Sequence, residues 1–110
     1  MQKPELEKAT KKYIAAMQDT EEYQNYCRMK EAAKADPTLW QQICDYRKRR
    51  YEFQNLTSQE ELFDRVDAFE REYRELKTDK RVVEFLNAEL AFCRMMQEVN
   101  LYIVEAMQFE

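Results

Sequence analysis

The stretch VVEFLNAELAFCRMMQEVN, Val82 to Asn100, decides the fold, because a helix built from it is apolar on more than one side. One apolar row keeps a three-four alternation: Phe85, Ala88, Phe92, Met95, Val99, Tyr102, Ala106 and Phe109. A second row runs beside it: Val82, Leu86, Leu90, Cys93, Met96, Ile103 and Met107. Together the rows cover well over half of the helix circumference, whereas one buried face needs a stripe of only ~100°. The helix, expected from about Lys80 to Phe109, therefore sits at the centre of a bundle or is shared with another chain.

The bulk composition indicates one folded domain over residues 1–110. Charged residues make up 36% of the chain and hydrophobic residues 45%, which is too apolar for a disordered chain and too charged for a membrane protein. No apolar run approaches the ~20 residues that a membrane-spanning helix needs. The first residues, MQKPELEKATKK, lack the apolar segment of a secretory signal, so we expect a cytoplasmic protein.

Two missing residue types exclude several classes of function. The sequence contains no glycine, which excludes phosphate-binding glycine loops, and no histidine, which is the commonest general base and metal ligand. The three cysteines are widely spaced and form no CxxC pair, which argues against a disulfide framework and a zinc site. The net charge of −4 argues against general affinity for nucleic acid. We expect no catalytic residue, no cofactor and no metal.

Capping signals divide the first half of the chain into three helices. Pro4 suits the first turn of a helix that ends near Met17. Asp19, with Glu22 three residues later, predicts a capping box for a second helix that ends near Ala35. The pair Asp36-Pro37 predicts the start of a third helix, which ends near Asn55.

A fourth helix and a break complete the expected architecture. Ser58 and Glu61 form another capping box, and the residues that follow have the spacing of a coiled-coil seam: Leu62, Val66, Phe69, Tyr73 and Leu76. The seam loses phase before Arg81, and Thr78 is expected to cap the last helix. One continuous helix is the alternative, because neither glycine nor proline marks the break. We therefore predict an all-α fold, a small bundle of about five helices with a long antiparallel C-terminal hairpin and coiled-coil-like packing.

The wide apolar surface of the last helix predicts self-association. A small bundle with long helices often completes its core by dimerising, and the flexible side chains of methionines suit changeable packing surfaces. Burial inside an ordinary core is the alternative. The residues expected at an interface come from the last helix and the seam: Phe85, Phe92, Met95, Val99, Tyr102, Leu62, Val66 and Phe69.

Glu89 and Asn100 interrupt the apolar surface of the last helix. They are eleven residues apart, which places them on one line along the helix. A buried carboxylate needs a partner, and Arg47, Arg50 or a tyrosine hydroxyl is the expected one. We interpret the two residues as a buried polar line that fixes helix register. A catalytic or ligand-binding carboxylate and a role at an interface are the alternatives.

The segment DYRKRRYEF, Asp45 to Phe53, supports an alternative function. Basic residues beside tyrosines can bind RNA, so an RNA-binding accessory protein that uses residues Tyr46 to Tyr51 is the second hypothesis. Consecutive helical residues point in different directions, however, and Asp45 can pair with Arg49. A solvated, salt-bridged face or a protein-binding patch explains the same charges.

Two segments resemble a known family. EEYQNYCRMKEAAKADP, Glu21 to Pro37, is similar to the N-terminal half of the YlbF/YmcA family of small helical bacterial proteins, which includes YheA-like members. VVEFLNAELAFCRMMQEVN is similar to the C-terminal half, including Ala88-Glu89 and Glu98 to Asn100. The resemblance extends from about Leu6 to Met107.

The resemblance implies a self-associating helical regulator without enzymatic activity. Members similar to YlbF and YmcA act with a partner, YaaT, in a complex that affects competence, sporulation, biofilm formation and RNase Y-dependent mRNA maturation. A YaaT-like protein or another family member is therefore the partner that the resemblance implies. The chain lacks a cysteine-rich tail, so the iron–sulfur clusters of that complex do not carry over.

Overall fold

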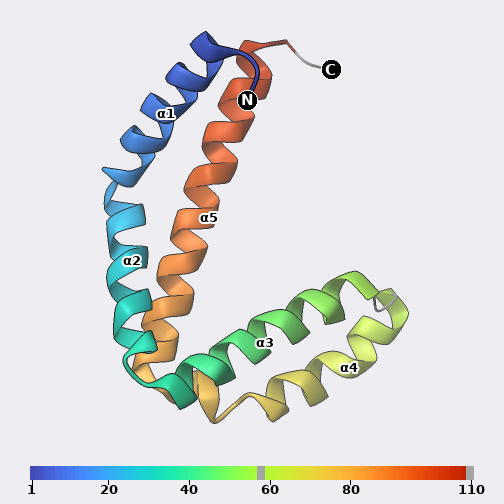
Figure 1. Ribbon diagram of the computed structural model, residues 1–110. Coiled ribbons are helices and arrows are strands. Elements are labelled where there is room, and N and C mark those ends of the chain that lie inside the picture. The colour runs from blue at the N-terminus through green and yellow to red at the C-terminus, as the bar shows by residue number, and fades with distance from the viewer. Residues whose placement is uncertain (57–58, 109–110) are drawn as a thin grey trace. The chain divides into compact units, whose positions relative to one another are not determined.

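The structure, a computed structural model, confirms the all-α fold (Figure 1). It describes the backbone of residues 1–56 and 59–108 and the side chains of residues 1–55 and 65–108. The described part contains no strand. It consists of five α-helices and one short 3-10 turn, Leu76–Thr78: α1 Pro4–Gln18, α2 Glu21–Lys34, α3 Pro37–Leu56, α4 Gln59–Glu72 and α5 Lys80–Ala106.

Local capping explains where α1, α2 and α3 begin. Pro4 occupies the first turn of α1, as expected. The backbone N–H of Leu39 donates to Asp36 Oδ1 at 3.1 Å, which confirms Asp36 as the cap of α3. The prediction for α2 was wrong by one residue. The N–H of Tyr23 donates to Thr20 Oγ1 at 3.2 Å, whereas Asp19 ends α1.

The break before α5 is confirmed, but its cap is Asp79. The N–H of Arg81 donates to Asp79 Oδ1 at 2.9 Å, while the Thr78 hydroxyl donates back to the carbonyl of Glu75. Helix α5 ends at Ala106, before the predicted Phe109, and Gln108 has a left-handed φ of 54°, the conformation that terminates helices. Ser58, the side chain of Glu61 and Phe109 lie outside the described residues.

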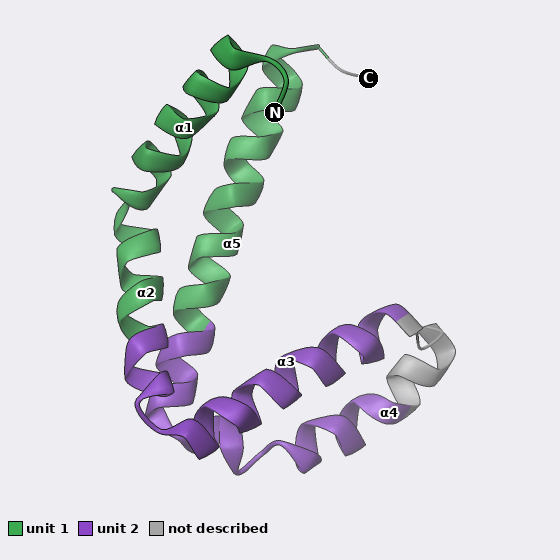
Figure 2. Ribbon diagram, in the orientation of Figure 1, with its two compact units in different colours: residues 1–29, 87–110 green, residues 30–86 purple. Residues whose placement is uncertain are grey.

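The chain divides into two compact units (Figure 2). Unit 1 contains residues 1–29 and 87–110, and unit 2 contains residues 30–86. Helices α2 and α5 each contribute to both units, so the expectation of a single domain stays a prediction. The hydrophobic core is unequally divided, because all but one of the buried hydrophobic residues belong to unit 2.

Unit 2 has a core rich in aromatic rings. Tyr46 of α3 contacts Phe69 of α4 and Tyr73 with ring centroids 5.9 and 5.0 Å apart. Trp40 of α3 meets Phe85 of α5 edge to face at 5.4 Å. The buried residues of the unit come from all its helices: Ala33, Leu39, Ile43, Tyr46, Phe69, Tyr73, Val82 and Phe85. Helices α3 and α4 lie side by side in this unit, and α5 contributes its first turns (Figure 2).

Unit 1 is a layer of helices with almost no interior. Helices α1 and α2 run beside α5 in the opposite direction (Figure 1). Phe92 of α5 packs on Tyr23 and Tyr26 of α2, with ring centroids 5.6 and 5.4 Å apart. Ala88 is the one hydrophobic residue of the described part of this unit that is buried.

The predicted long C-terminal hairpin is not confirmed. Phe69 and Tyr73, from the seam predicted for that hairpin, pack on Tyr46 and Phe53 of α3, with Leu86 of α5 at the edge of the same cluster. Of the predicted seam, Phe69 and Tyr73 are buried, Val66 is exposed, and the side chain of Leu62 lies outside the described residues. The seam spacing did not identify the helix that covers the buried part. Aromatic residues of α3 cover most of the buried part of the seam. Their spacing in the sequence does not indicate that they pack against α4.

Candidate protein-interaction surface

The predicted interface residues do not form one exposed surface. Phe85 and Phe69 are buried in unit 2, so the single chain does not present them to another chain. Phe92, Met95 and Val99 are half-buried in unit 1. Tyr102 and Val66 are exposed, and the side chain of Leu62 lies outside the described residues. The first apolar row of α5, which has the most regular spacing, therefore packs mainly against other helices of the same chain.

The second apolar row of α5 is the one that remains open. In unit 1 its large side chains, together with neighbouring Leu101, are 45–75% exposed: Leu90, Met96, Leu101, Ile103 and Met107. Cys93 lies in the same row and is exposed. At about 100° per residue the middle of this arc lies near Cys93, and its two edges adjoin the arc of Phe92 at Ile103 and the polar arc of Arg94 at Leu101. This second row was recognised in the sequence, but its spacing alone did not indicate that it stays exposed.

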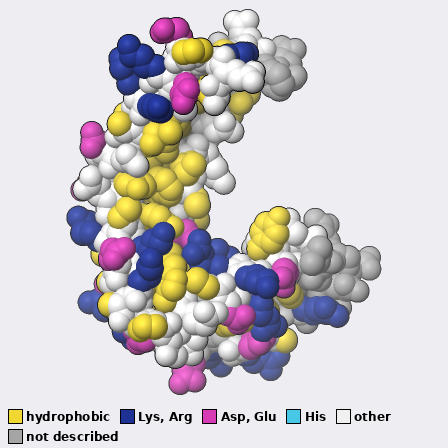
Figure 3. All heavy atoms as spheres, in the orientation of Figure 1, with side chains coloured by type: hydrophobic (Ala, Val, Ile, Leu, Met, Phe, Trp, Pro, Cys, Tyr) yellow, Lys and Arg dark blue, Asp and Glu magenta, His cyan; other side chains and the backbone are white. Residues whose placement is uncertain are grey.

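Helix α1 adds apolar side chains to the same unit. None of its residues is buried, although its apolar positions have regular helical spacing. Leu6, Tyr13 and Ile14 are 40–50% exposed. Figure 3 shows hydrophobic side chains over the middle of unit 1, where α1 and α2 lie beside α5. We call the exposed apolar residues of α1 and of the second row of α5 in this unit, together with Leu101, the open face: Leu6, Tyr13, Ile14, Leu90, Met96, Leu101, Ile103 and Met107.

The open face has the size of a protein interface. Taking about 180 Å² for each fully exposed side chain, its exposed fractions amount to roughly 730 Å². The largest apolar patch on a typical monomer is about 300–600 Å². A standard interface removes about 800 Å² from each partner. The open face is therefore larger than a monomeric protein normally exposes, and it matches one side of a standard interface.

Glu89 and Asn100 are not buried inside the chain. Glu89 is half-buried and Asn100 is exposed, and no polar or charged residue is buried in the described part of the structure. The two residues therefore lie outside the hydrophobic core of the single chain, and a polar line that fixes register stays a prediction. Both residues lie on the arc of α5 that carries Met96 and Ile103, because the first apolar row already fills the inward side.

The basic segment of α3 is engaged with aromatic rings of unit 2. The guanidinium carbons of Arg47, Arg49 and Arg50 lie 5.4–5.5 Å from the ring centroids of Phe85, Tyr73 and Tyr46. Cations over aromatic faces at such distances are attracted by the ring electrons. Lys48 is exposed. Three of the four basic side chains predicted to contact RNA therefore cover the chain's own core.

A hydrogen-bonded network joins α3 to the end of α4. The Tyr73 hydroxyl donates to Asp45 Oδ2 at 2.9 Å and accepts from Arg49 Nη1 at 3.0 Å, and Arg49 also pairs with Glu72. The hydrogen bonds to Glu72 and Tyr73 raise the pKa of the Arg49 guanidinium. Burial, followed by the bond to Asp45, raises the pKa of Tyr73. The network fixes the register of the two helices.

A Tyr73→Phe variant tests this network. We expect its free energy of unfolding to fall by about 1 kcal/mol, because one hydroxyl that serves two partners is lost while the ring stays packed. A raised pKa in the folded state stabilises the protein below pH 10 and loses that contribution as pH rises through the folded pKa. Urea unfolding at neutral and alkaline pH measures both effects. Tyr51→Phe, at an exposed position of α3, should change neither quantity, and an equal loss of stability in that variant would contradict the assignment.

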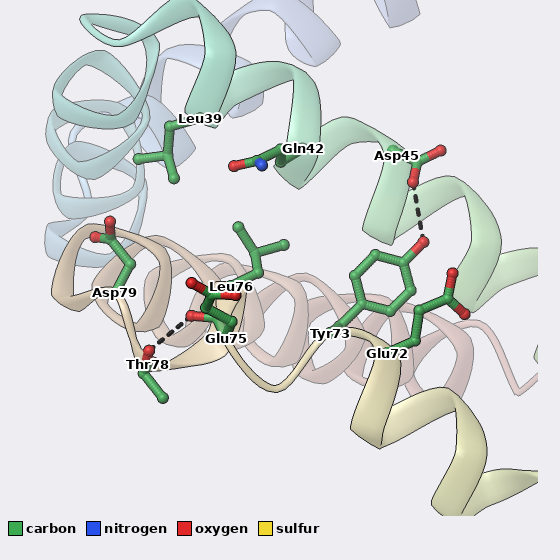
Figure 4. Close-up of a pocket in the computed structure, with 9 residues that line it drawn as sticks. All are labelled: Leu39, Gln42, Asp45, Glu72, Tyr73, Glu75, Leu76, Thr78 and Asp79. Atoms are coloured by element: carbon green, nitrogen blue, oxygen red, sulfur yellow. Dashed lines mark hydrogen bonds between the residues drawn. The ribbon is translucent and has the colours of Figure 1, made fainter.

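A pocket of about 650 Å³ lies beside this network (Figure 4). Leu39 and Gln42 of α3 and the segment 72–79 line it, and the Tyr73 hydroxyl points across it to Asp45 (Figure 4). Its carboxylates are mostly engaged, because Glu72 pairs with Arg49, and Asp79 pairs with Arg81 at 2.9 Å. The side chain of Arg81 lowers the pKa of Asp79. Within the described residues, no group of three or more metal-ligating side chains is close enough to hold an ion.

The comparisons with known proteins identify relatives by sequence. A family profile described as "Control of competence regulator ComK, YlbF/YmcA" matches residues 6–108. A protein of Caldicellulosiruptor bescii named "UPF0342 protein" is 22% identical over 97 residues, which cover 86% of this chain and 82% of that protein. No solved structure matches. None of the described helices is long and apolar enough to cross a membrane.

Proposed function

The chain belongs to the YlbF/YmcA family, whose description is regulatory, and from that premise we propose a non-enzymatic regulator that acts through protein–protein contacts and first binds a second copy of itself. The open face of unit 1 is the observation that carries the proposal. A layer of helices with one buried hydrophobic residue in its described part cannot exclude water from both sides. A second copy supplies the same apolar face by symmetry, so one surface covers both chains.

The geometry of unit 1 favours a second copy over an unrelated partner. Two antiparallel helical layers that pack face to face form a four-helix arrangement, a common way for helical hairpins to complete a core. The α5 part of the open face carries one charged residue, Glu89, at its border, so little charge must be desolvated. Asn100 lies on the same arc and can set the register between the two chains, as single polar residues do in coiled coils.

The proposal assigns no catalytic role to the pocket of unit 2. The sequence contains no histidine, and the carboxylates Asp45, Glu72 and Asp79 have partners within the chain. RNA binding through residues 46–51 has less support than protein binding, because three of the four basic side chains lie over aromatic rings. Control of the competence regulator ComK, which the family description names, is the regulatory step to test first.

A Met96→Asp variant tests self-association. We expect wild-type protein to have twice the chain mass of 13.5 kDa by light scattering, and the variant to have the mass of one chain. A charge at the centre of a dry apolar face must be desolvated without a partner, which weakens association by several kcal/mol. A residue that packs on α2, such as Phe92, is unsuitable for this test because its replacement also disturbs the chain's own packing.

The matched control is Ala91→Asp. Ala91 is exposed on the same helix, on the arc that carries Arg94 and Glu98, so the same side chain is introduced where water already covers the helix. This variant should keep the mass of the wild type, and in the native host it should restore regulation in a deletion strain when Met96→Asp does not. A wild-type protein that stays monomeric up to ~100 μM would refute the proposal, since a regulator needs a usable affinity.

A further inference from the structure

Helix α1 is held weakly by the rest of its own chain. It has no buried residue along its fifteen positions, and its N-cap, Lys3, makes no side-chain capping hydrogen bond. Its apolar side chains Leu6, Tyr13 and Ile14 stay 40–50% exposed although α5 runs beside them. The rest of the chain therefore covers only about half of the surface of each of these side chains, and water covers the remainder.

Polar contacts do not compensate for this small burial. The described ion pair of α1 joins Lys11 to Glu7 of the same helix, and the hydroxyl of Thr10 donates to the carbonyl of Leu6, also within it. The connections to α2 lie at the C-terminal end, where the Gln24 side chain donates to the carbonyl of Gln18. The polar contacts described for residues 4–18 thus lie within α1 or at its junction with α2.

A helix of this length is marginal without tertiary packing. Isolated helices shorter than ~12–15 residues are barely populated in water, because nucleation is costly and each residue adds little. Most of the helical stability of α1 must therefore come from an apolar surface that covers it. In the single chain, α5 covers only part of its apolar face, and the remaining part coincides with the open face.

We propose that α1 packs stably on α5 only when a second copy covers the open face, so that the order of α1 is coupled to assembly. This inference rests on the proposed self-association. In the free chain α1 opens and closes as a local unit, while unit 2 stays folded because it has its own core of buried aromatic residues. Each opening uncovers the C-terminal half of α5, including Met95 and Val99, and so changes the surface that the free chain presents to other proteins.

Amide hydrogen exchange of the full chain, read by mass spectrometry, tests the coupling. The variants are Met96→Asp and Ala91→Asp, and wild-type protein is measured above and below the concentration at which light scattering shows half-dissociation. We expect amides of residues 4–18 to exchange about tenfold or more faster in Met96→Asp and in diluted wild type. Amides of α3 and of residues 69–73 should exchange at the same rate in every sample.

The outcomes separate this inference from the proposed function. If the wild type dimerises but α1 exchanges equally slowly in both states, the coupling is refuted and the self-association stands. If amide exchange becomes equally faster in α1 and α3 of Met96→Asp, the coupling is also refuted, because the whole chain would then be opening. A wild type that is monomeric at every concentration refutes the proposed function, and the coupling with it. Ala91→Asp must behave as the wild type for the coupling to hold.

Discussion

Replacement of Phe85 by Ala is expected to lower the free energy of unfolding by about 3–5 kcal/mol, the range for truncating a buried aromatic ring. Phe85 is 0% exposed, packs edge to face on Trp40 at 5.4 Å, and lies under the guanidinium of Arg47 at 5.5 Å. The variant leaves a cavity where α5 enters unit 2 and removes the ring that Arg47 covers. Domains are stable by only about 5–15 kcal/mol, so this loss is a large fraction of the total.

Val83→Ala is the control for Phe85→Ala. Val83 lies two residues away on the same helix and is 40% exposed, so its truncation should change the unfolding free energy by about 0.5 kcal/mol or less. Urea unfolding followed by circular dichroism measures both variants. Comparable losses in the two would mean that burial of Phe85 does not stabilise unit 2, and would contradict the division of the core described above.

Tyr46→Ala should lower the free energy of unfolding by a similar amount, about 3–5 kcal/mol, because the ring of Tyr46 is both buried and covered by cations. The ring is 4% exposed and contacts both Phe69 and Tyr73, so it links α3 to α4. Two cations also lie over it, with Arg50 Cζ and Lys77 Nζ at 5.4 and 5.5 Å from its centroid. Each cation–π contact adds about 0.5–2 kcal/mol, depending on how far water is excluded.

Tyr51→Ala makes the same truncation five residues further along α3. Tyr51 is 68% exposed, so this variant should lose little stability. Both variants change helix propensity equally, so the difference between their unfolding free energies measures the effect of burial. Chemical unfolding at low and high salt separates the two contributions to stability. Salt screening weakens the cation–π contribution and leaves the contribution of apolar burial. If Tyr46→Ala unfolds at the same urea concentration as Tyr51→Ala, the aromatic cluster does not hold α3 on α4.

Local signals in the sequence predicted the helices well. Pro4 and the pair Asp36-Pro37 mark true helix starts, because proline fixes φ and aspartate accepts from free backbone N–H groups. Thr20 and Asp79 cap where Asp19 and Thr78 were predicted. Neighbouring residues with similar capping ability cannot be ranked without the backbone geometry, so these errors of one residue were unavoidable.

The candidate surface could be predicted only in part. The sequence indicated that α5 is apolar on two sides, which is why a second chain was expected. It did not indicate that the row of Phe92 packs on Tyr23 and Tyr26 while the row of Met96 stays open. Both rows have helical spacing and similar hydrophobicity, and the choice depends on the residues that α2 places opposite them.

By itself, the sequence determined the all-α class, the breaks between helices, the family and the excess of apolar surface on the last helix. The fold class, the breaks and the apolar excess follow from periodicity, capping and composition, which act over a few residues and can be read locally, whereas the family rests on the resemblance of two segments. Only the tertiary structure decided that the core belongs almost entirely to unit 2, that the basic residues of α3 cover aromatic rings, and that Glu89 and Asn100 lie outside the core. Burial depends on contacts between residues far apart in the chain, and helical periodicity specifies a face without specifying what covers it.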